Sequence, residues 1–386
     1  MATAGTLMVP KFLQALGNGT GIDAPGQKIV VIIQLSGGND GLNTIIPVRN
    51  DIYYRSRPGL GIKKENTLLL NEETGLNPQL PFFKELYDNG ELAILNGVGY
   101  PNPDRSHFRS MDIWHTASDS RSYLQTGWLG RYLDAQCNGC PHPTQILELD
   151  DLLSLALKGG KYNGLATKNP RQLFATGTQS YLQQMVDHHH NHEPVADYLY
   201  KTLADTINSA DYLFKESRKR PSKATYPNSE LGKSLQTIAS LAFSDINTRV
   251  YYVSLGSFDT HINQDAQQKR LFTELNDAVA SFIKDLKTNN RFNDLLLFSF
   301  SEFGRRVTQN ASGGTDHGTA NNMFFISGSL KKKGLVNPLP DLADLDNNDL
   351  KYSIDFRQVY QMVLEKWLNT NALTVLGEKF PLLEIV

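Results

Sequence analysis

Short apolar runs and stretches with helical periodicity alternate along most of the chain. Residues 29–35 read I-V-V-I-I-Q-L, and such a β-branched run predicts a strand buried on both faces of a parallel sheet. Similar runs predict strands at residues 91–96, 144–149, 249–255, 294–300 and 323–327. Helical periodicity predicts helices at residues 79–88, 108–116, 128–135, 265–287 and 356–368. This alternation predicts a doubly wound α/β domain.

A long polar, helix-favouring stretch with few strand signals interrupts the alternation at residues 170–243. We interpret this stretch as a helical insertion, because the strand pattern resumes directly after it. The sequence shows no internal repeat. We therefore expect a single domain over residues 27–386 and not a string of separate modules.

The composition indicates a globular protein without a general affinity for nucleic acid. Hydrophobic residues make up 40% of the chain and charged residues 20%, which provides material for a core and excludes general disorder. The net charge of -2 creates no global field that would attract nucleic acid or an anionic membrane, so no nucleic-acid partner is expected. Since no window holds eighteen consecutive apolar residues, no transmembrane segment is predicted.

Two features bear on the cellular compartment. Residues 2–9 are small and apolar and precede a segment rich in Gly and Asn, which fits either the remnant of an export signal or a flexible terminus over residues 1–26. Cys137 and Cys140 are spaced as C-N-G-C, which allows a small disulfide loop, a redox pair or half of a zinc site. A structural loop is the preferred interpretation, and a disulfide there would fit an exported protein.

Three polar motifs directly follow predicted strands, where ligands bind in open α/β sheets. The first motif reads S-G-G-N-D-G-L-N-T at residues 36–44. Its paired glycines can turn the backbone N–H groups toward an anion, and Asp40 offers a carboxylate just past the strand. The alternative is a tight turn in which Asp40 caps the next segment. The residues expected in an anion-binding loop are Gly37, Gly38, Asn39 and Asn43.

The second and third motifs add further candidate metal ligands. G-S-F-D-T-H at residues 256–261 places an Asp and a His two positions apart, so both can reach one cation. The third motif, S-E-F-G-R-R followed by G-G-T-D-H-G-T, contains an arginine, Arg305, that could either hold an anionic ester or pair with Glu302. The candidate ligands from the three motifs are Asp40, Asp259, His261, Glu302, Asp316 and His317.

This set of oxygen and nitrogen donors is large enough for one or two divalent ions. It suits Zn, Mn, Mg or Ca, and its lack of thiolates argues against a structural zinc site. Two ions could clamp the attacking and leaving oxygens of a phosphate-type ester.

A nucleophile in such a site would have to be a hydroxyl group, and Ser106 is the candidate. It lies in Y-P-N-P-D-R-S-H-F, near the start of a predicted helix where an anion is favoured. Alternatively, Ser106 is simply the N-cap of that helix. The histidine-rich run at residues 188–192 lies in the helical insertion, away from any strand end, so adventitious surface binding of metal is expected there.

Five motifs in a fixed order resemble the bacterial domain of unknown function 1501 family. They are Q-L-S-G-G-N-D-G-L-N-T-I-I-P, Y-P-N-P-D-R-S-H-F, G-S-F-D-T-H, F-S-E-F-G-R and G-G-T-D-H-G-T-A-N. The resemblance covers nearly the whole chain after about residue 28. The family is similar to the alkaline phosphatase and sulfatase superfamily, which implies a three-layer α/β/α sandwich around a large, mostly parallel sheet, with metals at the strand ends.

The resemblance also implies site residues and a location. It implies a periplasmic or otherwise exported protein, usually with a twin-arginine signal, and residues 2–16 resemble the remainder of such a signal. Ser106 falls near the position of the nucleophile. By position, the implied metal ligands are Asp40, Asp259, His261, Asp316 and His317.

Two departures from the superfamily pattern limit what can be carried over. Active members have D-H-G where this chain has Glu302, Phe303 and Gly304, so a phenyl group replaces a usual imidazole ligand. The C-x-P-S-R sequence that sulfatases modify to formylglycine is missing, because Cys140 is followed by P-H-P. Formylglycine-dependent sulfatase chemistry is therefore not expected.

Two functions fit these patterns. The first is an exported metal-dependent hydrolase that acts on a small phosphate or related anionic ester. The second is a catalytically degenerate member that binds a ligand, such as a cell-surface glycan, or a protein partner at the cell envelope, without turnover.

Overall fold

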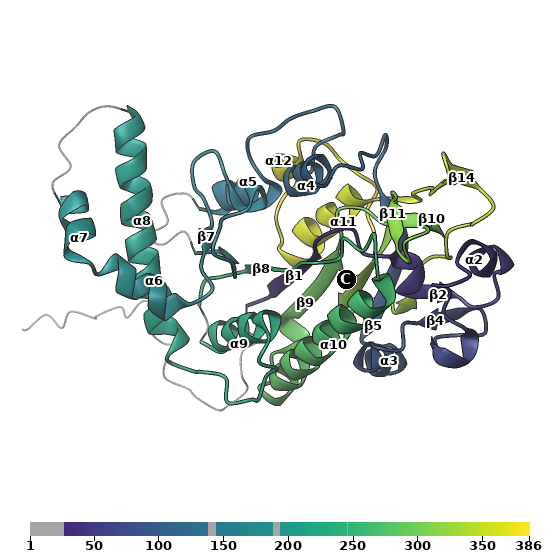
Figure 1. The fold of residues 1–386 in the computed structure, drawn as a ribbon. Coiled ribbons are helices and arrows are strands. Elements are labelled where there is room, and N and C mark those ends of the chain that lie inside the picture. The colour runs from purple at the N-terminus through teal and green to yellow at the C-terminus, as the bar shows by residue number, and fades with distance from the viewer. Residues whose placement is uncertain (1–26, 138–143, 188–193, 245) are drawn as a thin grey trace, which may run out of the picture.

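The protein is built around one large mixed sheet, shown by a computed structural model that describes residues 27–137, 144–187, 194–244 and 246–386 (Figure 1). The sheet has nine strands. In spatial order they are β13 (Gly334–Leu335), β5 (Leu92–Gly99), β12 (Asn321–Ile326), β9 (Leu295–Phe300), β1 (Ile29–Leu35), β8 (Val250–Leu255), β6 (Ile146–Glu148) and β7 (Leu165–Ala166), with β16 (Ile354–Asp355) also paired to β5. The large mainly parallel sheet expected from the sequence is confirmed.

Strand β1 lies at the centre of this sheet, as its apolar run predicts. All seven of its residues are buried, and it pairs in parallel with β8 on one side and β9 on the other. One strand departs from the parallel arrangement, because β12 runs antiparallel to both β5 and β9. The chain reaches β12 from a hairpin and not from a crossover helix, so β12 can only return in the opposite direction.

Helices cover both faces of the sheet, which confirms the three-layer sandwich (Figure 1). Side chains of Ile29, Val31 and Ile33 pack on one face with α3 (Pro81–Asp88), α9 (Glu230–Phe243) and α10 (Gln264–Thr288). The alternate side chains of Val30 and Ile32 pack on the other face. The helices there are α4 (His107–Thr116), α5 (Trp128–Gln136), α11 (Phe356–Met362) and α12 (Ala372–Leu376).

The predicted insertion is helical in its described part, but only some of it stands apart from the three layers. It consists of α6 (Pro170–Gly177), α7 (Ser180–Asp187), α8 (Pro194–Ser217) and α9. Figure 1 shows α6, α7 and most of α8 projecting beyond the edge of the sheet. By contrast, α9 buries Leu235 and Ile238 in the main core, because its apolar positions recur with helical spacing.

Smaller strands surround the carboxyl ends of the central strands. A three-stranded sheet contains β2 (Ile45–Pro47), β4 (Thr74–Leu76) and β3 (Leu68–Leu69), and lies beside the short helix α2 (Asp51–Ser56). Two hairpins follow later in the chain, β10 (Arg305–Gln309) with β11 (Thr315–His317), and β14 (Leu345–Asp346) with β15 (Asp349–Leu350). The loops after β1, β5, β8 and β9 all emerge at this rim, since these strands point the same way.

The remaining expectations concern membrane spans, the cysteines, the N-terminal segment and the histidine-rich run. Outside the gaps at 138–143, 188–193 and 245, no helix of residues 27–386 combines the length and apolarity that a membrane crossing requires. Cys137 is disulfide-bonded. The expected signal remnant at residues 1–26, Cys140 and the histidine-rich run at 188–192 lie outside the described residues.

Candidate metal centre

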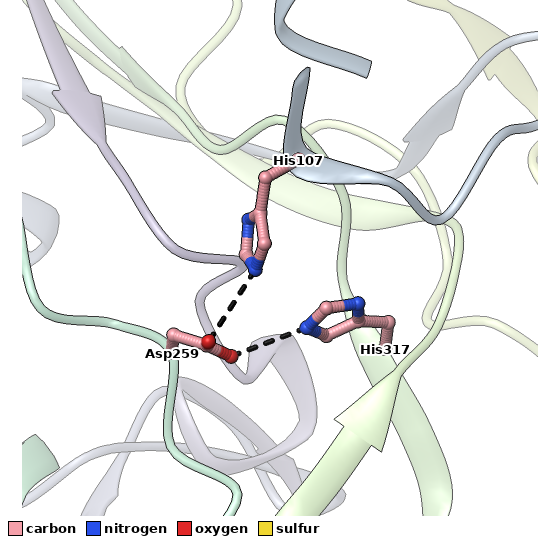
Figure 2. Close-up of side chains that lie close together, drawn as sticks. All are labelled: His107, Asp259 and His317. Carbon is pink, nitrogen blue, oxygen red and sulfur yellow. Dashed lines mark hydrogen bonds and ion pairs between the residues drawn. The ribbon is translucent and has the colours of Figure 1, made fainter. Parts of the chain in front are cut away.

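Three side chains from separate loops meet at the rim of the sheet. Asp259 follows strand β8, His107 is the first residue of α4 after strand β5, and His317 ends strand β11. One potential ligand atom from each lies within 4.8 Å of the others. Figure 2 shows both imidazole rings pointing at the Asp259 carboxylate from different sides.

The carboxylate of Asp259 is the centre of this group. Its Oδ2 atom lies 3.5 Å from Nε2 of His107, and its Oδ1 atom lies 3.2 Å from Nε2 of His317. A third histidine joins them, because Nε2 of His261 lies 3.1 Å from Oδ1 of Asp259 and 2.9 Å from Nε2 of His317. Three imidazole nitrogens therefore face one carboxylate.

Each of these imidazoles has an acceptor at its other nitrogen. An acceptor at Nδ1 places the ring proton there and leaves the Nε2 lone pair free for a cation. The acceptors are Oε1 of Glu302 at 2.9 Å from His107, Oδ1 of Asp316 at 3.2 Å from His261, and the carbonyl oxygen of Arg105 at 2.8 Å from His317. This pattern of outer hydrogen bonds is the usual environment of metal-binding histidines.

The distances fit a metal ion. With bonds of roughly 2.0–2.1 Å to a tetrahedral ion, neighbouring ligand atoms lie about 3.3 Å apart. The three imidazole Nε2 atoms lie 3.1 to 3.5 Å from the Asp259 carboxylate, and those of His261 and His317 lie 2.9 Å apart. Nε2 of His107 is also buried, and within the described part of the chain it makes no hydrogen bond. A cation would satisfy this nitrogen, and His107, Asp259 and His317 can each offer one atom to a single divalent ion.

The surroundings keep the central carboxylate ionised. Burial raises the pKa of Asp259, but the hydrogen bond from Arg305 and the charge of its guanidinium group oppose burial, and the pKa falls to about 2. The hydrogen bond to Glu302 raises the pKa of His107 despite burial, whereas burial lowers the pKa of His317. The group therefore offers one fixed negative charge surrounded by imidazoles.

Arg305 is not available to a substrate, which corrects its expected role as an ester-binding group. Its side chain is 0% exposed, and Nη2 donates to Oδ1 of Asp259 at 2.6 Å. Nε donates to the carbonyl oxygen of Gly38 at 2.6 Å, and Nη1 donates to that of Thr315 at 2.8 Å. Nη2 also donates to the carbonyl oxygens of Gly37 and Phe258. Arg305 thus holds Asp259 in place and joins the loops around it.

Glu302 also lies behind the centre and is not one of the side chains that face the ion. Its carboxylate is 0% exposed, and Oε1 accepts hydrogen bonds from Nδ1 of His107 and from the backbone N–H of Gly37 at 2.8 Å. The glycine turn after β1 therefore does bind an anion, but the anion is a carboxylate of the chain itself. Gly37 has φ of +118°, and a Cβ atom there would lie 2.4 Å from the backbone nitrogen of Asp259, so only glycine allows this approach.

The rest of the expected anion-binding loop is also occupied internally. The backbone N–H of Asn39 donates to Oγ of Ser301 at 2.8 Å, and its side-chain amide donates to Thr44. The amide of Asn43 donates to the carbonyl oxygen of Leu60. Gly38 has φ of +77° and packs closely against the Phe303 ring. These contacts stabilise the turn and occupy the donors of Asn39 and Asn43 within the chain.

Asp40 lies in a separate buried ion pair and not in the histidine group. Its Oδ2 atom accepts a hydrogen bond from Nη1 of Arg57 at 2.5 Å, and the two side chains are 1% and 0% exposed. Oδ2 also accepts from Gln264, and Oδ1 accepts from the backbone N–H of Leu42, which is the capping role considered as the alternative. Because both oxygens have internal donors, the assignment of Asp40 as a metal ligand is not supported.

Two further expected residues lie near the centre in different roles. Asp316 is largely exposed and orients His261, so it is an outer partner and not a direct ligand. Ser106 occupies the N-cap position of α4, directly before His107, but its side chain makes no capping hydrogen bond to the described residues.

The ring of Phe303 packs against His107 and His317, with centroids 4.8 and 4.6 Å away. The phenyl group thus supports two imidazoles at the place where a ligand was expected.

His107 is the member of the group that the sequence motifs did not single out as a ligand. It stands beside Ser106 in the proline-rich loop after β5, and that loop position is the signal that could have identified it.

Removing the charge of Glu302 should weaken metal binding without unfolding the protein. We expect Glu302→Gln to lower the affinity for Zn²⁺ by about tenfold or more, because the outer carboxylate increases the basicity of His107. Competition with a chelating dye measures the affinity. The control is Asp40→Asn, which leaves Arg57 without its counter-charge and should cost about 3 kcal/mol of unfolding free energy in a urea titration while the affinity is unchanged. Equal affinities for Glu302→Gln and the unmodified protein would contradict the arrangement.

Comparisons with known proteins bear on the family and not on the activity. The model of the family described as Protein of unknown function (DUF1501) matches residues 96–348, which is more than half of the 386 residues. No curated protein sequence matches the chain.

Similar solved structures include a lipoteichoic acid synthase from Listeria monocytogenes, with 10% identity, a TM-score of 0.38 and coverage of 94% of this chain and 74% of that chain. They also include the soluble domain of lipooligosaccharide phosphoethanolamine transferase A from Neisseria meningitidis, with 11% identity, a TM-score of 0.35 and coverage of 80% and 79%. An alkaline phosphatase from the Antarctic bacterium TAB5 has 11% identity, a TM-score of 0.34 and coverage of 78% and 92%. Likenesses this weak assign no activity. The match over residues 96–348 shows that the chain belongs to the DUF1501 family, whose members are proteins of unknown function.

Proposed function

We propose that the protein is a metal-dependent hydrolase of a phosphate or related anionic ester. The observation that carries this proposal is the convergence of three imidazole Nε2 atoms on the carboxylate of Asp259, each with an acceptor at Nδ1. A divalent ion held there supplies Lewis-acid polarisation of the ester. Because nitrogen ligands predominate, the donors favour Zn over Mn, Mg or Ca, which prefer oxygen ligands.

The chain's own residues prepare this centre for a substrate. Arg305 and Glu302 are fully buried and hold Asp259 and His107 in position, so the ligand side chains need little rearrangement. In contrast, the side chains of Asp259 and His261 are 46% and 41% exposed. The centre is therefore rigid on its inner side and open to solvent on its outer side, where an ester can approach.

Ser106 is the proposed nucleophile. It is exposed at the N-terminus of α4, where the unpaired backbone N–H groups and the helix dipole favour an anion. Its neighbour His107 belongs to the metal centre, and its hydroxyl group is not used to cap the helix. If Ser106 does not attack the ester, a water molecule has to take this role.

Replacing one imidazole should remove both metal and activity. We expect the protein to bind about one equivalent of Zn²⁺, since three side chains hold one ion and leave a fourth position for the ester. In His317→Ala, we expect metal content and hydrolysis of p-nitrophenyl phosphate and bis-p-nitrophenyl phosphate to fall to background. Metal analysis of the purified proteins and release of nitrophenol measure the two effects.

Two controls belong to this experiment. His115→Gln changes a buried histidine that hydrogen-bonds Gln34 and Tyr252 outside the centre, and it should keep the metal. To remove adventitious binding, every protein compared carries serine in place of His188, His189, His190 and His192. A metal content that His317→Ala leaves unchanged would contradict the proposed centre.

The Ser106→Ala variant distinguishes a serine nucleophile from water. We expect turnover to fall to background while the metal content and the thermal unfolding midpoint stay the same, because the hydroxyl group makes no capping bond. Ser180→Ala, at the start of α7 and far from the centre in Figure 1, is the matched control. Turnover that survives in Ser106→Ala would show that Ser106 is not the nucleophile.

A catalytically degenerate protein that binds a glycan or another ligand is the second candidate. The burial of Arg305 favours it, since this arginine was the cationic group expected to hold the ester. Bound metal without any ester hydrolysis in the unmodified protein would support this second function.

Export is part of the proposal. The disulfide bond at Cys137 supports it, because disulfides persist in oxidising compartments. Fractionation of bacterial cells that express the full chain should find it outside the cytoplasm, and recovery in the cytoplasm with a reduced Cys137 would contradict export.

A further inference from the structure

A cavity of about 610 Å³ opens beside the metal centre. It shares Glu302 and Phe303 with the support of the imidazoles, and it is also lined by Arg105, whose carbonyl oxygen accepts the hydrogen bond from Nδ1 of His317. A volume of this size is typical of small-molecule sites. Arg105 is also the residue directly before Ser106 and His107, so the part of the substrate that adjoins the ester has room in this cavity.

One wall of the cavity is the β14–β15 hairpin. Its two central residues, Asn347 and Asn348, have φ of 50° and 67°, as a two-residue type I′ turn requires. The hairpin is fastened by an ion pair between the buried carboxylate of Asp349 and Arg105, and by a hydrogen bond from Thr319 to the carbonyl oxygen of Leu350. The wall is thus tied to the loop that carries His107, which makes it a fixed part of the site.

Aromatic rings form the floor and part of the rim. Tyr100, Trp114 and Phe303 line the floor. The hydroxyl group of Tyr100 is bonded to Ser110, and the indole N–H of Trp114 donates to the carbonyl oxygen of Glu302. These rings therefore offer the cavity their carbon surfaces and not their polar atoms.

The rim combines an exposed aromatic ring with amides. Tyr352 is 40% exposed at the edge of the cavity. It packs against Gly99, where a Cβ atom would approach Cβ of Tyr352 to 2.9 Å. Asn102 and Asn347 contribute side-chain amides, which donate and accept hydrogen bonds. A ring with an apolar C–H face and a hydroxyl-bearing edge matches both kinds of surface, whereas a purely apolar ligand would desolvate the amides without replacing their hydrogen bonds.

We propose that this cavity binds a sugar-like, polyhydroxylated ring of the substrate, and that Tyr352 is the platform on which the ring stacks. This inference rests on the proposed function, because it places the ester of the same molecule at the metal centre. It names the substrate class as a phosphate or related anionic ester of a sugar.

The test measures sugar binding separately from hydrolysis. Ligand-detected NMR titrations of the full chain use glucose, N-acetylglucosamine, galactose and ribose as ring probes and glycerol as the acyclic probe. We expect the unmodified protein to bind at least one ring probe more tightly than glycerol. Tyr352→Ala should weaken that binding by about tenfold, the loss expected for one aromatic stacking contact. Tyr181→Ala, which changes an exposed tyrosine of α7, should bind like the unmodified protein.

The outcomes separate this inference from the proposed function. His317→Ala should keep its sugar affinity, since His317 does not line the cavity. Absence of binding for every ring probe, or equal binding by Tyr352→Ala and the unmodified protein with unchanged unfolding midpoints, overturns the cavity assignment. Ring binding that depends on Tyr352, in a protein that hydrolyses no ester, sustains the cavity assignment and overturns only the hydrolase.

Discussion

The ion pair between Arg305 and Asp259 is the contact on which the rest of the centre depends. The buried guanidinium group of Arg305 also donates to carbonyl oxygens of Gly37, Gly38, Phe258 and Thr315. A single side chain therefore ties together the loops after β1 and β8 and the β10–β11 hairpin. Since a buried guanidinium group is costly unless it is paired, these loops cannot separate without exposing an unsatisfied charge. The negative charge that would attract a metal ion is held in place by the same contact.

A second buried carboxylate, that of Glu302, holds the imidazole of His107 in position. It accepts a hydrogen bond from Gly37 on one side and from the imidazole on the other, so the glycine turn and the first residue of α4 share one buried anion. The turn has the backbone geometry of an anion-binding loop, and the chain supplies the anion itself. The glycine motif after β1 therefore contributes to the centre by positioning Glu302, which in turn orients His107.

Much of the fold follows from local patterns in the sequence. The β-branched run at β1 and the apolar runs at β8 and β9 are buried in parallel because each is hydrophobic on both faces. The helices α3, α4, α5 and α10 lie within a few residues of their expected bounds, since their periodicity is strong. The antiparallel direction of β12 and the packing of α9 in the core were not predictable in this way, because both depend on contacts with distant segments.

The sequence by itself determined which loops carry the chemistry, because polar motifs that follow buried strands must emerge at the carboxyl edge of the sheet. It predicts that Asp259, His261 and His317 lie in those loops. Only the tertiary structure decided which side chains face one another and which lie behind them. Asp40 pairs with Arg57, and His107 lies beside Asp259. In both cases the packing of distant segments decides which group of opposite charge lies within reach. Partners of that kind are separated by many residues, and no local pattern encodes them.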